Sequence, residues 1–141
     1  MATPLKNILC IDDENDILEI AKFALETLGH FHLEICSNSK EALDRAAETK
    51  PDMILLDVIM PDKDGLSVYR ELRQTPQLAN VPVAFMTAKV QPSEVQNYLD
   101  MGAEGVISKP FDPLALPDAV QSLWRARQTK TQNKIMVGSS R

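Results

Sequence analysis

Residues 53–61 read MILLDVIMP, and the rest of the chain is best understood from this stretch. It is a short apolar run with a single carboxylate, Asp57, and it lies between Pro51 and the turn-forming sequence PDKDG at 61–65. A bounded apolar run of this length is typical of a strand buried on both faces of a parallel sheet. Because an unpaired carboxylate is costly inside such a strand, we expect Asp57 at its C-terminal end, where open parallel sheets bind ligands. Taken alone, Asp57 is equally well explained as a solvated acid that ends the strand.

The composition indicates one soluble globular domain. The chain has 141 residues, of which 44% are hydrophobic and 25% charged, so it can bury one core but not two. No apolar run approaches the length of a membrane span, and the first residues, MATPLKNILCIDDE, lack the pattern of a signal peptide. We therefore expect a cytoplasmic protein in which Cys10 and Cys36 are reduced thiols packed as small hydrophobic groups. A contact between the two thiols is an open alternative, and a functional disulfide is the less favoured one.

The charge is distributed unevenly along the chain. Residues 1–124 carry a net charge of −10, whereas residues 125–141 carry five basic residues and no acid. An acidic body argues against direct binding of nucleic acid by the domain. We expect a domain over residues 1–127 and a flexible, basic and polar tail over residues 128–141.

Apolar runs and helical patterns alternate from one end of the chain to the other. This alternation predicts an α/β fold: a single, doubly wound, five-stranded parallel sheet with right-handed crossovers. The residues at 32–36 alternate between polar and apolar, which favours an edge strand. We expect strands at 7–11, 32–36, 53–57, 81–86 and 106–108, and helices at about 16–28, 40–48, 66–73 and 92–101, followed by a last helix.

The helix ends can be predicted from capping residues. Gly29 is expected to cap the first helix. Asp112 and Pro113 are suited to the start of the last helix, but Pro117 would remove a backbone hydrogen bond one turn later, so the regular helix is expected to begin near Leu116.

The first helix is expected to bury one apolar face, made of Ile17, Ile20, Ala21, Ala24, Leu25 and Leu28.

Polar residues follow four of the five predicted strands. Asp12 and Asp13 follow the first strand, Asp57 ends the third, Thr87 follows the fourth and Lys109 follows the fifth. The carboxyl ends of parallel strands lie at one edge of a sheet, so these side chains can converge on one pocket. Chance explains any one of them, but it does not explain five on one edge.

Three neighbouring carboxylates repel one another, which a divalent cation would relieve. Oxygen ligands with positions left open for phosphate suit Mg²⁺, and three carboxylates, one lysine and one Mg²⁺ are neutral in sum. A carboxylate that the metal does not need can attack phosphorus, and Asp57 on the central strand is the best candidate. Thr87 supplies a hydroxyl and Lys109 a positive charge for phosphoryl oxygens.

Four motifs then point to a known family. The chain resembles the receiver domain of two-component response regulators over about residues 5–127. This resemblance implies a flavodoxin-like fold with strand order 2-1-3-4-5 and a cis peptide bond before Pro110. The motifs are IDDE at 11–14, LLDVIMPDKDG at 55–65, MTA at 86–88 and KPF at 109–111.

The resemblance also implies roles for the site residues. Asp57 would accept a phosphoryl group from the phosphohistidine of a sensor histidine kinase or a phosphotransfer protein, Thr87 would turn toward that group and Lys109 would bind it. The only chemistry would be self-phosphorylation and self-dephosphorylation, so we expect a signalling domain and not an enzyme. As a stand-alone receiver, it would change its binding to an unknown downstream protein, as a monomer or weak dimer. The implied Mg²⁺ ligands are Asp12, Asp13, Asp57 and the backbone carbonyl of Ile59.

One position departs from the family pattern. Many receivers carry an aromatic switch residue on the fifth strand, where this chain has Val106. The usual paired movement of threonine and aromatic residue is therefore not expected in its usual form. Tyr98 is a candidate substitute, although partly buried packing is the favoured explanation for it. His30 and His32 have no ligand-spaced partners and are expected at the surface.

Two other protein classes and one other role share part of this pattern. A haloacid-dehalogenase-like phosphohydrolase also uses an aspartate after a strand, but it needs a second acid two residues later, where this chain has Ile59. A flavodoxin-like cofactor carrier needs a phosphate-binding loop after the first strand, which this sequence lacks. A site that binds metal without signalling is the third alternative.

Overall fold

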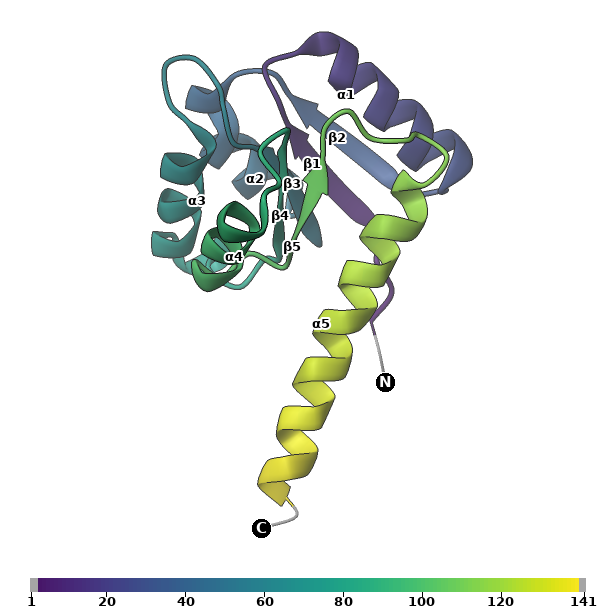
Figure 1. Ribbon diagram of the computed structural model, residues 1–141, viewed down its shortest axis with the longest axis vertical. Helices are drawn as coiled ribbons and strands as arrows, with labels where there is room; N and C mark the ends of the chain where they lie inside the picture. Colours follow the sequence, from purple (N-terminus) through teal and green to yellow (C-terminus); the bar gives the residue numbers. More distant parts are fainter. Residues whose placement is uncertain (1–2, 140–141) are drawn as a thin grey trace.

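A five-stranded parallel sheet forms the centre of the molecule (Figure 1). The computed structural model describes residues 3–139, with side chains described through residue 128. The strand order is β2-β1-β3-β4-β5, as the resemblance implied, so β2 and β5 are the edge strands. The strands are β1 (Asn7–Ile11), β2 (His32–Cys36), β3 (Met53–Asp57), β4 (Val83–Thr87) and β5 (Gly105–Ser108).

The three inner strands form the core of the sheet. Every residue of β3 and β4 is buried, as expected for strands covered on both faces. The fourth strand begins at Val83, two residues later than predicted, and ends at Thr87. Pro82 has no N–H to donate, and its carbonyl accepts a hydrogen bond from the N–H of Ile54, so it leads into β4 without belonging to it.

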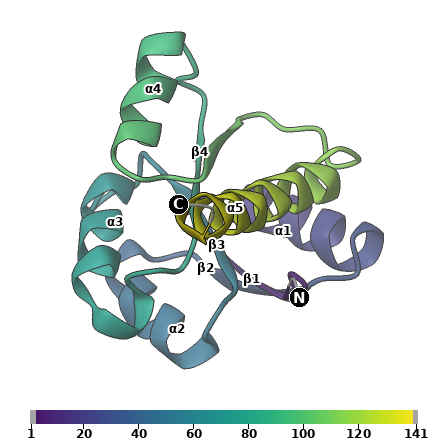
Figure 2. The same ribbon diagram turned by 90° about the horizontal axis from the view of Figure 1, so that it is seen from below.

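Helices cover both faces of this sheet (Figure 2). One apolar cluster packs α2, α3 and α4 against one face, and a second packs the first and last helices against the other. The doubly wound α/β prediction is therefore confirmed. The helices are α1 (Asn15–Lys22), α2 (Ala42–Thr49), α3 (Gly65–Gln74), α4 (Pro92–Asp100) and α5 (Leu116–Ser139), with a π-helix η1 (Phe23–Leu28) and two 3-10 turns, η2 (Ser39–Glu41) and η3 (Pro76–Leu78).

The first helix differs from the prediction in its buried face and in the geometry of its second half. It continues as the π-helix η1, whose wider turn changes the spacing of side chains on the buried face. Ile20 and Leu28, expected inside, are 39% and 38% exposed, and Leu18 is buried instead. Gly29 does cap the helix, but the left-handed residue of the turn is His30, with a φ of 61°.

The last helix begins at Leu116, as expected. Asp112 organises the turn before it: its Oδ1 accepts the N–H of Leu114, and its carbonyl accepts the N–H of Leu116. The helical backbone continues to Ser139 and projects from the body of the domain (Figure 1), so residue 127 is not its end. The division of the chain into a domain and a flexible tail stays a prediction.

The two cysteines lie on opposite faces of the sheet. Cys10 belongs to the cluster under the first and last helices, and Cys36 to the cluster under α2 and α3. Both are free and buried, so no disulfide joins them and their packing as small hydrophobic groups is confirmed. In residues 3–139 no helix combines the length and the apolar composition needed to cross a membrane.

Candidate functional site

The predicted site residues meet at the C-terminal edge of the sheet. Asp57 is the last residue of β3 and Thr87 the last of β4, and these strands run side by side. Asp12 follows β1, which is the other neighbour of β3, and Lys109 follows β5. Asp12, Asp57 and Thr87 are all at most 3% exposed, so this edge holds an unusually buried polar group.

Lys109 is the centre of the polar contacts. Its Nζ lies 2.8 Å from Asp12 Oδ2, 3.3 Å from Asp57 Oδ1 and 3.4 Å from Glu14 Oε1. Burial lowers the pKa of the Lys109 ammonium, but its hydrogen bond to Asp12 and the charges of Asp12 and Asp57 outweigh burial and raise that pKa. The ammonium therefore stays charged and neutralises one carboxylate of the cluster.

Glu14 is a site residue that sequence reasoning missed. Its carboxylate reaches Lys109, and its N–H donates a 2.9 Å hydrogen bond to Asp12 Oδ1, which orients that carboxylate. The available signal was its place as the third acid of the motif IDDE at 11–14.

Asp57 is a carboxylate in an unfavourable environment. Its Oδ2 is buried and has no hydrogen-bond partner among the residues that the structure describes. Burial, followed by the negative charge of Asp12, raises the pKa of Asp57 to about 7, although Lys109 acts in the opposite direction. An unpartnered buried oxygen is expensive, which indicates that this position is built to receive something.

The raised pKa predicts a pH dependence of stability for the metal-free protein. Between about pH 4 and pH 7, folded Asp57 keeps a proton that the unfolded chain has already lost, so stability falls as pH rises through this window. Asp57→Asn should remove this slope and raise the free energy of unfolding above pH 7 by on the order of 2 kcal/mol. Urea denaturation in the presence of a chelator, repeated at several pH values, measures the free energy of unfolding of both proteins. If the free energy depended on pH in the same way in the wild-type protein and in Asp57→Asn, the prediction would be contradicted.

The acidic cluster fits a divalent cation. One oxygen from each of Asp12, Asp13 and Asp57 lies within 4.8 Å of the other two, and Asp13 is the most exposed of the three residues. Several carboxylate oxygens with an open side toward solvent are a donor set that suits Mg²⁺. The predicted contribution of the Ile59 backbone carbonyl stays a prediction.

A cleft opens beside Asp57. It has a volume of about 430 Å³, and the exposed Ile59 side chain lines it together with Thr87 and Lys109. The Thr87 hydroxyl accepts the N–H of Lys89 at 3.0 Å, so it holds the loop after β4. The peptide bond between Lys109 and Pro110 is cis, as the resemblance implied. The cleft is lined by Glu14, Ile17, Asp57, Ile59, Thr87, Ala88, Lys109 and Pro110.

Tyr98 lies away from this cleft. It is only 7% exposed, and its ring centroid lies 5.3 Å from that of Phe85, which in turn packs 5.3 Å from Tyr69. Val106 packs beside the same cluster. The packing explanation for Tyr98 therefore fits the structure better than a role as an exposed reporter.

The comparisons with known proteins settle the family. A model of the response regulator receiver domain matches residues 8–121 of the chain. The chain belongs to the response regulator receiver domain family. It is thus a receiver domain of the kind found in two-component systems, and the five-stranded fold with order 2-1-3-4-5 is the fold of this family.

Two curated relatives of this receiver domain are transcriptional regulatory proteins. The alkaline phosphatase synthesis transcriptional regulatory protein PhoP of Bacillus subtilis is 36% identical over 131 residues, which cover 93% of this chain and 53% of PhoP. The phosphate regulon transcriptional regulatory protein PhoB of Pseudomonas aeruginosa is 34% identical over 120 residues, covering 85% of this chain and 52% of PhoB. The receiver chain therefore spans about half the length of the curated relatives it matches.

Solved structures match it over nearly their full length. The chemotaxis protein CheY4 of Vibrio cholerae superimposes with a TM-score of 0.77 at 28% identity, covering 85% of this receiver and 99% of CheY4. A response regulator from Desulfuromonas acetoxidans gives a TM-score of 0.78 at 27% identity, covering 86% and 98% of the two chains.

Proposed function

We propose that this receiver domain accepts a phosphoryl group on Asp57 and that phosphorylation changes its binding to a downstream protein. The donor is the phosphohistidine of a sensor histidine kinase or a phosphotransfer protein. The observation that supports this function best is the buried Oδ2 of Asp57, which has no hydrogen-bond partner within the described part of the chain and lies beside a cleft lined also by Thr87 and Lys109.

The transfer needs an ionised, positioned carboxylate. An Asp57 oxygen attacks phosphorus and forms a P–O bond, the P–N bond to the donor histidine breaks, and its electron pair returns to the imidazole. Lys109 already lies 3.3 Å from Asp57, so its ammonium can pair with a phosphoryl oxygen as the carboxylate becomes an acyl phosphate. Thr87 ends the neighbouring strand, where its hydroxyl can donate to the same group.

Asp12, Asp13 and Asp57 would hold Mg²⁺, and the Ile59 carbonyl would join them. When bound, the cation supplies positive charge that offsets the carboxylates and the incoming phosphoryl oxygens. Asp12 is well placed for this, because Glu14 and Lys109 fix both of its oxygens.

Labelling with a small phosphodonor distinguishes the proposed receiver function from that of a phosphohydrolase. A receiver should take up at most one phosphoryl group per chain in the presence of Mg²⁺, in a linkage that is stable to acid and labile to base. Sustained turnover of a phosphate monoester would instead favour a phosphohydrolase. Binding of Mg²⁺ with no labelling by any phosphodonor would leave only the metal site and contradict the proposal.

The metal site gives a separate prediction. Asp13→Ala removes the most exposed carboxylate of the cluster and should weaken Mg²⁺ binding at least about tenfold. A fluorescence or calorimetric titration measures the affinity. Asp16→Ala is the control, because Asp16 is exposed on α1 and lies outside the cluster. An unchanged affinity in Asp13→Ala would remove Asp13 from the ligand set.

The wider biological role rests on the same proposal. A cytoplasmic location, a stand-alone domain and a monomer or weak dimer stay predictions. Phosphotransfer profiling against the histidine kinases of the source organism would identify the phosphoryl donor.

A further inference from the structure

The outer edge of β2 has backbone groups that β1 does not use. The N–H of His32 donates to the carbonyl of Lys6, and the carbonyl of Cys36 accepts the N–H of Asp12, so these alternate residues bond to β1 and its flanks. In a parallel pair the residues between them direct their N–H and C=O groups outward. Leu33 and Ile35 therefore present the free edge of the sheet, where another strand could pair.

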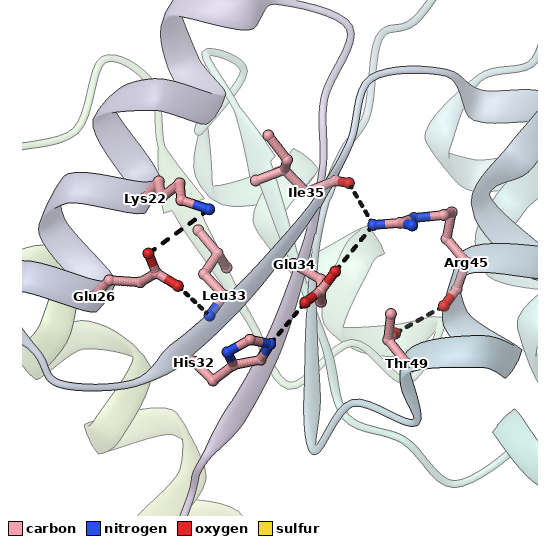
Figure 3. Close-up of polar contacts among 8 residues, drawn as sticks. All are labelled: Lys22, Glu26, His32, Leu33, Glu34, Ile35, Arg45 and Thr49. Carbon is pink, nitrogen blue, oxygen red and sulfur yellow. Dashed lines mark hydrogen bonds and ion pairs between the residues drawn. The ribbon is translucent and has the colours of Figure 1, made fainter.

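Two side chains already occupy this edge (Figure 3). The Glu26 carboxylate accepts the N–H of Leu33 through Oε2 at 3.1 Å. Arg45 Nη2 donates to the carbonyl of Ile35 at 3.1 Å, and it also lies 3.1 Å from Oε1 of Glu34. One outward donor and one outward acceptor of β2 are therefore bonded within the chain.

The two edge-capping side chains, Glu26 and Arg45, come from opposite sides of the sheet. Glu26 lies on η1 and Arg45 on α2. Glu26 is also paired with Lys22 at 3.7 Å, and both capping side chains are only about a third exposed, at 32% and 34%. The helices therefore hold the Glu26 and Arg45 side chains in the space beside β2 that an added strand would occupy.

We propose that Glu26 and Arg45 keep the β2 edge closed against a second copy of this chain. The occupant that they exclude is the same edge strand, added in antiparallel orientation about a twofold axis. Without the capping side chains, the N–H and C=O groups of Leu33 are free to bond to those of a second Leu33 across such an axis, and Arg45 no longer covers the edge beside Ile35.

The side chains of β2 select the register of this pairing. With Leu33 opposite Leu33, each His32 faces Glu34 of the second copy. The two groups are chemically matched, since His32 Nε2 and Glu34 Oε2 already lie 2.7 Å apart within one chain. A register centred on Glu34 would instead set two carboxylates directly opposite each other, which is destabilising. The occupant is therefore a second β2 strand in the register centred on Leu33.

The test is the oligomeric state of the Glu26→Ala/Arg45→Ala variant. Sedimentation velocity should show a monomer in the wild-type protein and a concentration-dependent doubling of mass in the variant. Adding His32→Glu places like charges opposite each other and should return the variant to a monomer. Arg70→Ala/Asp100→Ala is the matched control, because it removes one arginine and one acid at exposed positions on α3 and α4, away from this edge, and it should stay monomeric.

Hydrogen exchange provides a second measurement on the single variant Glu26→Ala at low concentration. The Leu33 amide should exchange about tenfold faster than in the wild-type protein, while the His32 amide, bonded to Lys6, keeps its protection. Glu26→Gln retains an acceptor oxygen and should exchange at nearly the wild-type rate. The proposal is overturned if the folded double variant stays monomeric, if its dimer survives His32→Glu, or if Leu33 exchange in Glu26→Ala is unchanged.

Discussion

Asp57→Asn is expected to abolish covalent labelling by a small phosphodonor in the presence of Mg²⁺. The amide has nearly the same shape as the carboxylate but lacks the negative oxygen that attacks phosphorus, so the rate should fall by at least about a thousandfold. The fold should survive, because the substitution relieves a buried carboxylate whose Oδ2 is unpartnered in the described part of the chain. Mass spectrometry of the intact chain after incubation with the donor measures the result.

Asp62→Asn is the matched control. Asp62 is an exposed acid in the loop after β3, and its φ of 68° is one that asparagine tolerates. This variant should label at the wild-type rate. Labelling of Asp57→Asn at the wild-type rate would show that another residue is the nucleophile.

Gly65→Ala is expected to destabilise the domain by about 3 kcal/mol, lowering Tm by roughly 10 °C. Gly65 opens α3, and its N–H bonds to the carbonyl of Val58 just after β3. An added Cβ would lie 2.0 Å from the backbone oxygen of Asp57, a contact that only a backbone shift can relieve. Since the atom it meets belongs to the proposed phosphoacceptor, the folded fraction should also label more slowly.

Gly29→Ala provides the comparison for this loss of stability. Its added Cβ would lie 2.9 Å from the backbone oxygen of Leu25 and 2.9 Å from the Phe31 ring, so a much smaller shift relieves the contacts than at Gly65 and the loss should be nearer ~1 kcal/mol. Thermal unfolding followed by circular dichroism measures both variants. Equal melting temperatures for Gly65→Ala and the wild-type protein would show that α3 can move away from β3 without strain.

The errors in the sequence prediction share one cause. The first helix was predicted from a regular 3.6-residue period. The π-helix η1 breaks that period and leaves Leu28 at the surface, while in the regular part, α1, the buried face contains Leu18 in place of Ile20. Glu14 was part of the motif IDDE at 11–14, but it was not predicted as a partner of Lys109, because the two residues are separated by 95 positions in the sequence. Both errors concern how a residue is oriented, and local patterns do not contain that information.

The sequence by itself determined the order of strands and helices along the chain and the site residues at the ends of four of the five strands. Short apolar runs, capping residues and turn residues act over a few neighbouring positions, so they can be recognised without coordinates. Only the tertiary structure decided that Lys109 bonds to Asp12 across 97 residues, that burial raises the pKa of Asp57, and that Glu26 and Arg45 close the β2 edge. These contacts depend on sheet register and helix placement, and the energy of a charge depends on what surrounds it after folding.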